Sequence, residues 1–195
     1  LLMIPVVTTF KGKGAFPENH PLSLGPIGMH GHAEANKLMT EADCVLAIGT
    51  RFSDRSVGTF EEFEKNLKII HMDVDPAEIG KNQTTSVAVV GDVQASLRIM
   101  VKLLLKKTSQ KSNDNPWSKH VNEVKDYWRE NLKLHPGEMG AAKILRKLRE
   151  LLPKESIVTT EVGQHQMWAS LFYDVIQPGT FFSSTGLGTM GWGFP

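Results

Sequence analysis

Short apolar runs alternate with helical segments along residues 1–107. The runs have the length and composition of buried strands, and they predict strands at residues 4–8, 44–48, 68–74 and 86–90. Residues 31–42 have a helical pattern, and Asp75 followed by Pro76 is typical of a helix start. Asp92 is expected to cap another helix, because apolar residues recur after it at three- and four-residue spacing. This alternation predicts an α/β fold, with a mostly parallel sheet and flanking helices.

The pattern changes at residues 106–115, which contain no apolar side chain and are typical of a linker. Beyond them, two apolar stripes at helical spacing predict helices whose apolar faces belong to a core. The stripes consist of Trp117, Val121, Val124 and Trp128, and of Ile144, Leu145, Leu148, Leu151 and Leu152. A strand at 156–160, a short helix at 167–173 and a strand at 180–184 follow. We therefore expect an α/β domain at 1–107, the linker, and at 116–195 a helical connection leading into a truncated second α/β domain.

Composition and charge narrow the class of partner. The chain has 195 residues, of which 41% are hydrophobic, and its formal net charge is +1. This content fits a packed globular protein, and the near-zero charge removes the electrostatic argument for nucleic acid or a membrane surface as partner. No apolar run approaches the roughly 18 residues of a membrane-spanning helix. A small-molecule ligand is the expected partner.

The single cysteine, Cys44, cannot form an internal disulfide. Its apolar neighbours predict a buried free thiol, and one unpaired cysteine favours a reducing, cytoplasmic location. The chain begins with Leu1 rather than methionine and ends in a glycine-rich turn. We interpret it as a piece of a longer polypeptide.

Two motifs in the second half are candidates for ligand contacts. Residues 186–191 match the G-x-G-x-x-G pattern after a predicted strand, which indicates a dinucleotide fingerprint, a plain glycine turn, or a loop that packs Met190 against a planar ligand. The fingerprint would also require a following helix and an acidic residue further on. Residues 161–165 follow a strand and open a helix, so Gly163, Gln164 and His165 either bind a phosphate or simply cap the helix.

In the first half, the candidates follow predicted strands, where ligands of open α/β sheets bind. Gly49, Arg51 and Arg55 leave one strand, and the two arginines either bind a phosphate or carboxylate or pair with Asp54. Asp73 ends another strand and is placed to accept hydrogen bonds from a ribose or a ring.

The segment with Gly28 and His30 precedes a helix, which suggests that its backbone lies against a ligand. His30 and His32 lack nearby cysteine or carboxylate ligands, so a metal site there is not expected. No combination of aspartate, serine and cysteine indicates covalent catalysis.

Taken together, six segments resemble acetolactate synthase large subunits in order and spacing. They are residues 4–14, 28–31, 49–55, 70–75, 162–168 and 186–191. The resemblance implies the central domain of that thiamine-diphosphate enzyme family, its linker and the opening of its C-terminal domain. Ser53, His32, Ala33 and Glu34 depart from the family's usual residues.

The resemblance also implies cofactors. FAD would contact Thr9, Phe10, Gly28, His30, Gly49, Arg51, Arg55, Asp73, Val74 and Asp92. Thiamine diphosphate would contact Val162, Gly163, Gln164, His165, Gly188 and Met190. Met190 would hold that cofactor in its bent form, and Arg55 would recognise the acceptor. The Mg²⁺ that accompanies the diphosphate would have its ligands outside these residues.

The implied activity is that of a transferase in branched-chain amino acid (isoleucine and valine) biosynthesis, which decarboxylates pyruvate and joins the product to a second 2-keto acid. The isolated chain is expected to be inactive, because the family's activating glutamate and metal-binding segment lie elsewhere. A homodimer or higher oligomer and a regulatory small subunit are the implied protein partners. The alternatives are another thiamine-diphosphate carboligase or decarboxylase, a flavin-free acetolactate synthase, and a non-catalytic nucleotide-binding module.

Overall fold

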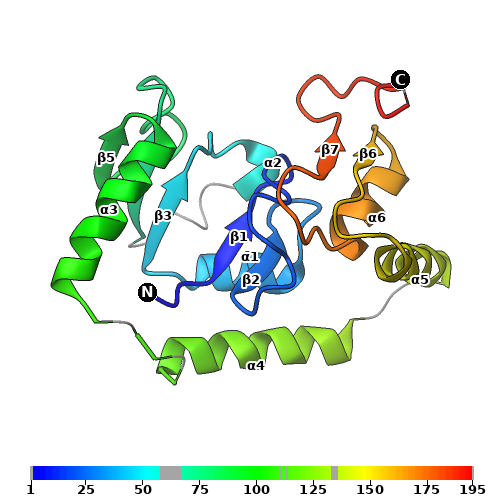
Figure 1. The fold of residues 1–195 in the computed structure, drawn as a ribbon, viewed down its shortest axis with the longest axis horizontal. Coiled ribbons are helices and arrows are strands. Elements are labelled where there is room, and N and C mark those ends of the chain that lie inside the picture. The colour runs from blue at the N-terminus through cyan, green and yellow to red at the C-terminus, as the bar shows by residue number, and fades with distance from the viewer. Residues whose placement is uncertain (1, 58–66, 110, 113, 133–135, 195) are drawn as a thin grey trace.

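The computed structural model describes residues 2–57, 67–109, 111–112, 114–132 and 136–194 (Figure 1). The strands are β1 (Val6–Thr8), β2 (Ser23–Pro26), β3 (Cys44–Ile48), β4 (Lys68–Asp73), β5 (Val87–Val90), β6 (Val158–Thr160) and β7 (Phe181–Ser183). The helices are α1 (Ala33–Thr40), α2 (Asp54–Val57), α3 (Val93–Lys107), α4 (Pro116–Asn131), α5 (Pro136–Leu151) and α6 (Gln164–Phe172). Among the described helices, none is both long enough and apolar enough to span a bilayer.

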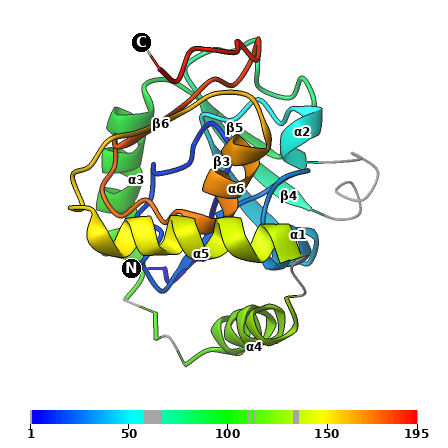
Figure 2. The ribbon, with the colours of Figure 1, turned by 90° about the vertical axis from the view of Figure 1, so that its right-hand side faces the viewer.

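Every strand pair in the described residues is parallel. The strands form a β1-β2 pair, a three-stranded sheet in the order β3-β4-β5, and a β6-β7 pair. The first two sheets and their helices lie on one side of the molecule, and β6, β7, α5 and α6 lie on the other (Figures 1 and 2). The parallel sheets and the helices beside them confirm the predicted α/β class.

The core of the first half has two clusters of buried apolar side chains. One lies between β2, α1 and α4 and contains Leu24, Ile27, Ala35, Leu38, Val121 and Val124. The other lies around β3 and β4 and contains Met39, Ala47, Phe52, Val57 and Ile69. The stripe predicted for α4 is therefore core at Val121 and Val124, with Trp128 packed against it. Through this stripe, α4 packs on the first domain.

The helix start predicted at Asp75 is wrong. Residues 76–81 form a turn, in which the Asp75 carboxylate accepts a hydrogen bond from the Ala77 amide at 2.9 Å. Gly80 then adopts a left-handed φ of +76°, which a continuing helix does not allow. Asp75 does bond to the backbone that follows it, as a capping residue would, but that backbone is a turn rather than a helix.

Two burial predictions are also wrong. On α5, the side chains of Ile144, Leu148 and Leu151 are exposed, because the helix packs on α6 through another face. That face includes the buried Ala142. It also includes the partly buried Arg149, whose guanidinium lies over the Tyr173 ring at 5.2 Å and donates to the Tyr173 hydroxyl at 2.8 Å. Cys44 is exposed rather than buried, because it begins β3 at the rim of a hollow.

The cap predicted at Asp92 is confirmed, since its carboxylate accepts from the Ala95 amide at 2.7 Å. No residue of α3 is fully buried, so the helix depends on its cap more than on packing. We expect Asp92→Ala to lower the free energy of unfolding by about 1 kcal/mol, measured by urea denaturation. Gln94→Ala, two residues further along at an exposed position, is the matched control, and an equal loss in both variants would refute the cap's role.

Candidate cofactor sites

The first candidate site lies where β1, β3, β4 and β5 end. Ile27 donates its amide to the Thr8 carbonyl at 2.9 Å, which brings the segment after β2 beside the end of β1. Gly49 donates to Met72 at 2.8 Å, and Gly91 donates to Asp73 at 2.9 Å. These contacts gather the loops after the strands at one edge of the fold, as expected for parallel strands.

The loop at Gly28 packs directly on the backbone of α2. Gly28 has a φ of +101°, and a Cβ there would collide with the carbonyl oxygen of Arg55. The Met29 amide donates to that same oxygen at 3.0 Å. The Asn36 side chain completes the loop by accepting from the Gly28 amide at 2.8 Å and donating to its carbonyl at 3.0 Å. The structure thus brings Gly28 and its neighbour His30 next to Arg55.

The buried His71 stabilises the loop after β3. His71 on β4 lies with Nε2 at 2.9 Å from the Thr50 carbonyl, and its ring meets Phe52 edge-on with centroids 5.3 Å apart. Phe52 is buried and has a φ of +48°, a conformation that costs energy for a residue with a side chain. The packing of Phe52 and His71 stabilises this conformation and fixes where Arg51 leaves the loop.

The arginines of this loop are exposed. Neither Arg51 nor Arg55 forms an ion pair with any residue in the described part of the chain. The Asp54 carboxylate instead accepts from the Arg55 backbone amide at 2.8 Å. The sequence left two interpretations of these arginines open, which were ligand binding and pairing with Asp54. In the structure, neither guanidinium group pairs with Asp54.

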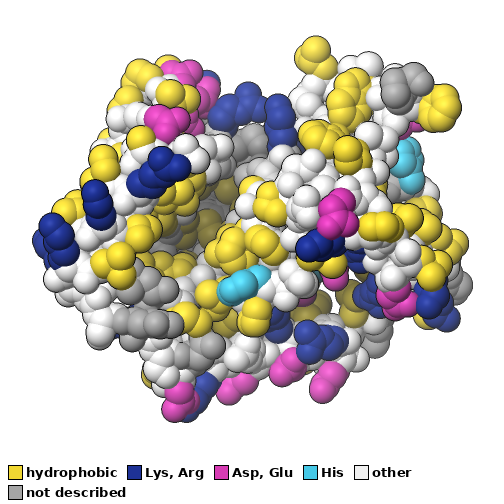
Figure 3. All heavy atoms as spheres, in the orientation of Figure 1, with side chains coloured by type: hydrophobic (Ala, Val, Ile, Leu, Met, Phe, Trp, Pro, Cys, Tyr) yellow, Lys and Arg dark blue, Asp and Glu magenta, His cyan; other side chains and the backbone are white. Residues whose placement is uncertain are grey.

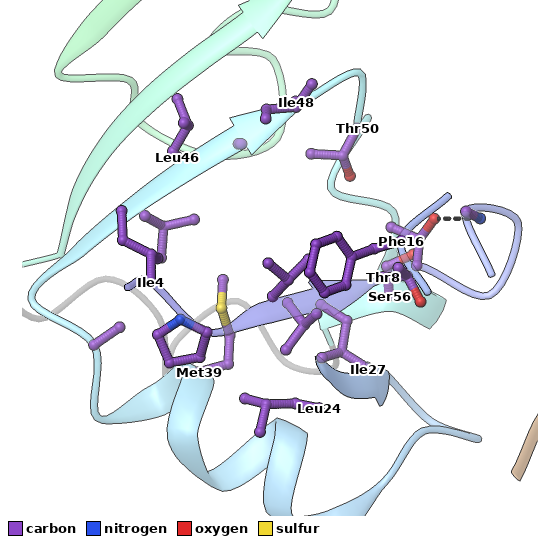
Figure 4. A pocket seen from close by; sticks show the side chains of 18 of the residues that line it. Ile4, Thr8, Phe16, Leu24, Ile27, Met39, Leu46, Ile48, Thr50 and Ser56 are labelled. Atoms are coloured by element: carbon purple, nitrogen blue, oxygen red, sulfur yellow. Dashed lines mark hydrogen bonds between the residues drawn. The ribbon is translucent and has the colours of Figure 1, made fainter. Parts of the chain in front are cut away.

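The ten predicted flavin contacts form two groups. Thr9, Phe10, Gly28, His30 and Arg55 lie around the ends of β1 and β2, and Gly49, Arg51, Asp73, Val74 and Asp92 lie around the ends of β3, β4 and β5. Asp73 is buried and accepts from the Asp75 amide at 2.9 Å, whereas Val74 is exposed. An apolar hollow lies between β1 and β3 (Figures 3 and 4).

The second candidate site lies at the ends of β6 and β7. Gln166 on α6 donates to the Ser183 hydroxyl at 2.7 Å and to the Ser184 carbonyl at 2.8 Å, which fixes α6 against the end of β7. Beside it, Glu161 Oε2 and Thr185 Oγ1 are buried and have no hydrogen-bond partner in the described structure. Buried polar atoms without partners are uncommon, and they indicate a place where a polar ligand binds.

The predicted residues of this site lie together. A Cβ on Gly163 would approach His165 Nδ1 at 2.8 Å, so the imidazole folds over the start of α6. Gly188 has a φ of +68° and lies against Val162. Met190 is 77% exposed, and residues 190–193 form a turn rather than a helix.

A buried ion pair joins the two halves of the chain. Lys13 Nζ lies 2.6 Å from Glu18 Oε2, and both side chains are almost fully buried. Glu18 also accepts from the Val175 amide at 2.7 Å and donates its own amide to the Val175 carbonyl at 2.9 Å. Burial lowers the pKa of the Lys13 ammonium, and the nearby Glu18 opposes that shift. The pair connects the segment after β1 with the segment between α6 and β7.

Several of these residues were not predicted from the sequence. Asn36, His71, Gln166, Lys13 and Glu18 act by contacts with segments distant in the sequence, which a single sequence does not reveal. No group of three or more histidine, cysteine or carboxylate side chains suited to a metal occurs within the described residues.

Two family models match parts of this chain. Residues 1–100 match the family model described as "Thiamine pyrophosphate enzyme, central domain". The chain belongs to the thiamine pyrophosphate enzymes. Residues 161–195 match the model for the C-terminal TPP binding domain of the same enzymes, TPP being thiamine diphosphate. The second candidate site therefore lies in the thiamine-pyrophosphate-binding domain of this family.

Curated proteins similar to this chain include acetolactate synthases. A probable acetolactate synthase large subunit of Methanococcus aeolicus is 43% identical over 214 residues, covering 100% of this chain and 35% of that protein. One from Methanocaldococcus jannaschii is 42% identical, and chloroplastic acetolactate synthase 1 of Zea mays is 44% identical, each over 98% of this chain. The chain spans about a third of the length of these curated relatives.

Proposed function

We propose that this chain is part of the catalytic large subunit of an acetolactate synthase. The observation that carries the proposal is the similarity to such subunits along the whole chain, which includes both candidate sites. The reaction is decarboxylation of pyruvate followed by carboligation to a second 2-keto acid, in branched-chain amino acid biosynthesis. We expect the activity in the parent polypeptide, as a homodimer or larger oligomer in the cytoplasm, with a regulatory small subunit as a further candidate partner.

Thiamine diphosphate is proposed to bind at the ends of β6 and β7. No side chain caps the start of α6, where Gly163, Gln164 and His165 would present backbone amides to a diphosphate. Gly188 and the exposed Met190 would lie against the pyrimidine ring. The unpartnered atoms of Glu161 and Thr185 fit a polar heterocycle, and the bound cofactor's thiazolium ring supplies the electron sink. Its Mg²⁺ would be held by residues outside this chain.

FAD is proposed to bind at the strand ends of the first domain. Two arginines without ion-pair partners in the described structure, and backbone loops at Gly28 and Gly49, fit a nucleotide with a diphosphate. A Cβ on Gly49 would meet nothing within 4 Å, so that loop leaves room for a ligand. Flavin absorbance of the purified full-length protein tests this assignment separately from the synthase activity.

Arg55 is proposed to bind the carboxylate of the acceptor 2-keto acid. A guanidinium grips a carboxylate with two parallel hydrogen bonds, worth about 1.5 to 3 kcal/mol. We expect Arg55→Ala in the full-length enzyme to lower the rate of acetolactate formation about 10- to 150-fold. Decarboxylation of the first pyruvate should fall less, because that step does not use the acceptor. Both products, acetolactate and acetaldehyde, are measured in the same assay.

Two further variants serve as controls for this experiment. Arg98→Ala removes an exposed arginine of α3 that has no proposed role, and it should leave both rates unchanged. Arg55→Lys retains the charge but not the two-pronged geometry, so it should recover only part of the lost activity. An unchanged ratio of the two products in Arg55→Ala would contradict the proposed role of Arg55. Absence of acetolactate from the wild-type full-length protein would contradict the proposed function itself.

A further inference from the structure

Two successive carbonyl groups of the loop after β3 are bonded by side chains that are distant in the sequence. The Thr50 carbonyl lies 2.9 Å from His71 Nε2, and the Arg51 carbonyl accepts from Asn82 Nδ2 at 2.8 Å. Figure 4 shows Thr50 on this loop, just beyond the end of β3. His71 belongs to β4, and Asn82 follows the turn at residues 76–81.

These two carbonyl groups belong to the two peptide planes on either side of the Arg51 Cα atom. Each peptide group is planar, so the backbone at a residue has only two soft torsion angles, φ and ψ, which relate the two planes. A hydrogen bond to each plane therefore fixes both angles at Arg51. The direction in which the Arg51 side chain leaves the backbone is fixed with them.

His71 contributes a hydrogen bond and not only packing. Its side chain is almost fully buried, and its second ring nitrogen, Nδ1, has no hydrogen-bond partner in the described structure. A carbonyl oxygen only accepts, so Nε2 carries a proton and donates it to Thr50. An apolar side chain of similar size would fill this space without leaving a buried nitrogen unpaired, which is costly. The bond to Thr50 is what the imidazole adds here.

The loop needs these bonds because its backbone is strained at the next residue. Phe52 has a φ of +48°, a left-handed conformation that is unfavourable for any residue with a side chain. Without bonds to the preceding peptide planes, the backbone would relax towards an ordinary conformation and carry Arg51 with it. The Arg51 side chain itself is exposed and forms no ion pair with the described residues, so nothing else in that part of the chain directs it by charge.

We propose that His71 and Asn82 are positioning residues that set the affinity for FAD through Arg51. This inference rests on the proposed FAD site and extends it to two residues outside the ten predicted contacts. The two hydrogen bonds direct the guanidinium before the cofactor binds, so binding does not have to order it. Loss of either bond leaves Arg51 present but misdirected, which weakens FAD binding and leaves the separate thiamine diphosphate site unchanged.

Titration of FAD into the cofactor-free full-length protein, followed by flavin fluorescence, tests this inference. We expect Asn82→Ala to raise the Kd for FAD about 2- to 12-fold, the factor that corresponds to one lost hydrogen bond. Asn131→Ala is the matched control, because Asn131 is also exposed and donates to a backbone carbonyl, that of Tyr127, at 2.8 Å. That variant should bind FAD as the wild type does.

Variants of the histidine distinguish its hydrogen bond from its packing. His71→Leu retains an apolar side chain of similar size without the donor, and it should raise the Kd for FAD by a similar factor. His71→Gln places an amide N–H at about the reach of Nε2, so it should recover part of the lost affinity. Circular dichroism verifies that these variants of a buried residue fold, and the exposed Asn82 tests the inference independently of them.

A double-variant cycle with Arg51→Ala shows whether the effect passes through Arg51. In the Arg51→Ala protein, Asn82→Ala should have no further effect on the Kd for FAD, because the group that it positions is absent. An equal factor in both backgrounds, no change in Asn82→Ala alone, or an equal rise in the Kd for thiamine diphosphate would each overturn the inference. A wild-type protein that binds no FAD would overturn the proposed FAD site itself, and this inference with it, before any variant is measured.

Discussion

Replacing Lys13 with methionine is expected to lower the free energy of unfolding by about 3 to 5 kcal/mol, because it leaves the Glu18 carboxylate buried without its cation. Within the part of the chain that the structure describes, the Glu18 carboxylate would retain only the hydrogen bond from the Val175 amide. A carboxylate that has left water and lost its counter-charge is among the most destabilising features of a protein interior. Urea denaturation of the wild type and the variant measures the difference.

The control for this variant removes both charges. Lys13→Met combined with Glu18→Gln leaves an uncharged pair in the same space, and the glutamine carbonyl still accepts from Val175. We expect the double variant to recover most of the stability that the single variant loses. A double variant as unstable as Lys13→Met would show that packing of the lysine stem, and not charge, is responsible for the loss.

The same lysine gives the wild type a pH dependence that the methionine variant lacks. Burial lowers the pKa of Lys13 in the folded state below its ordinary value of 10.5, so the folded protein releases this proton at a lower pH than the unfolded chain. Between those two pKa values the unfolded state binds more protons, and stability due to this group rises with pH.

The position of this ion pair connects it with both candidate sites. Lys13 and Glu18 follow β1, whose end carries Thr9 and Phe10, and Val175 lies between α6 and β7. Lys13 Nζ also lies 5.6 Å from the centroid of the Phe181 ring, at the start of β7. The strand that leads to the flavin candidates and the strand that leads to Gly188 and Met190 are therefore held by one buried cluster.

Much of the first domain was predictable because its strands are continuous apolar runs. The register of Cys44 with Lys68 and of Ile70 with Val87 places the strands where those runs occur. By contrast, β2 reads Ser-Leu-Gly-Pro, and glycine and proline are depleted in strands. The pair has only two strands, so β2 has an unpaired edge, where Pro26 does not have to donate to a neighbouring strand.

The site was predictable where backbone conformation requires a particular residue. Gly28, Gly49 and Gly188 all have positive φ values, and such glycines give motifs that can be recognised in a sequence. The side chains that hold these loops were not predictable, since Asn36 and His71 contribute through contacts that depend on the tertiary fold. The prediction that the apolar stripe of α5 is buried was wrong for the same reason. Periodicity in a sequence does not show which face of a helix a neighbouring helix covers.

Replacing Gly28 with alanine is expected to have the second large effect on the free energy of unfolding. In Gly28→Ala, the new Cβ would collide with the Arg55 carbonyl oxygen, and the residue would have to keep a φ of +101°. Relief of the collision separates the loop from α2 and breaks the hydrogen bond from Met29 to Arg55. The strained backbone and the lost hydrogen bonds together should lower the free energy of unfolding by about 3 kcal/mol or more.

Gly80→Ala separates the two causes of this loss. Gly80 also has a left-handed φ, +76°, but a Cβ there meets nothing within 4 Å, so only the backbone cost of about 1 to 2 kcal/mol remains. Thermal or urea unfolding of both variants gives the contribution of the collision as the difference between them. Equal losses would mean that α2 moves away from the loop at no cost. A larger loss in Gly28→Ala would show that the loop and α2 form one rigid unit, and that the position of Arg55 depends on the absence of a side chain at residue 28.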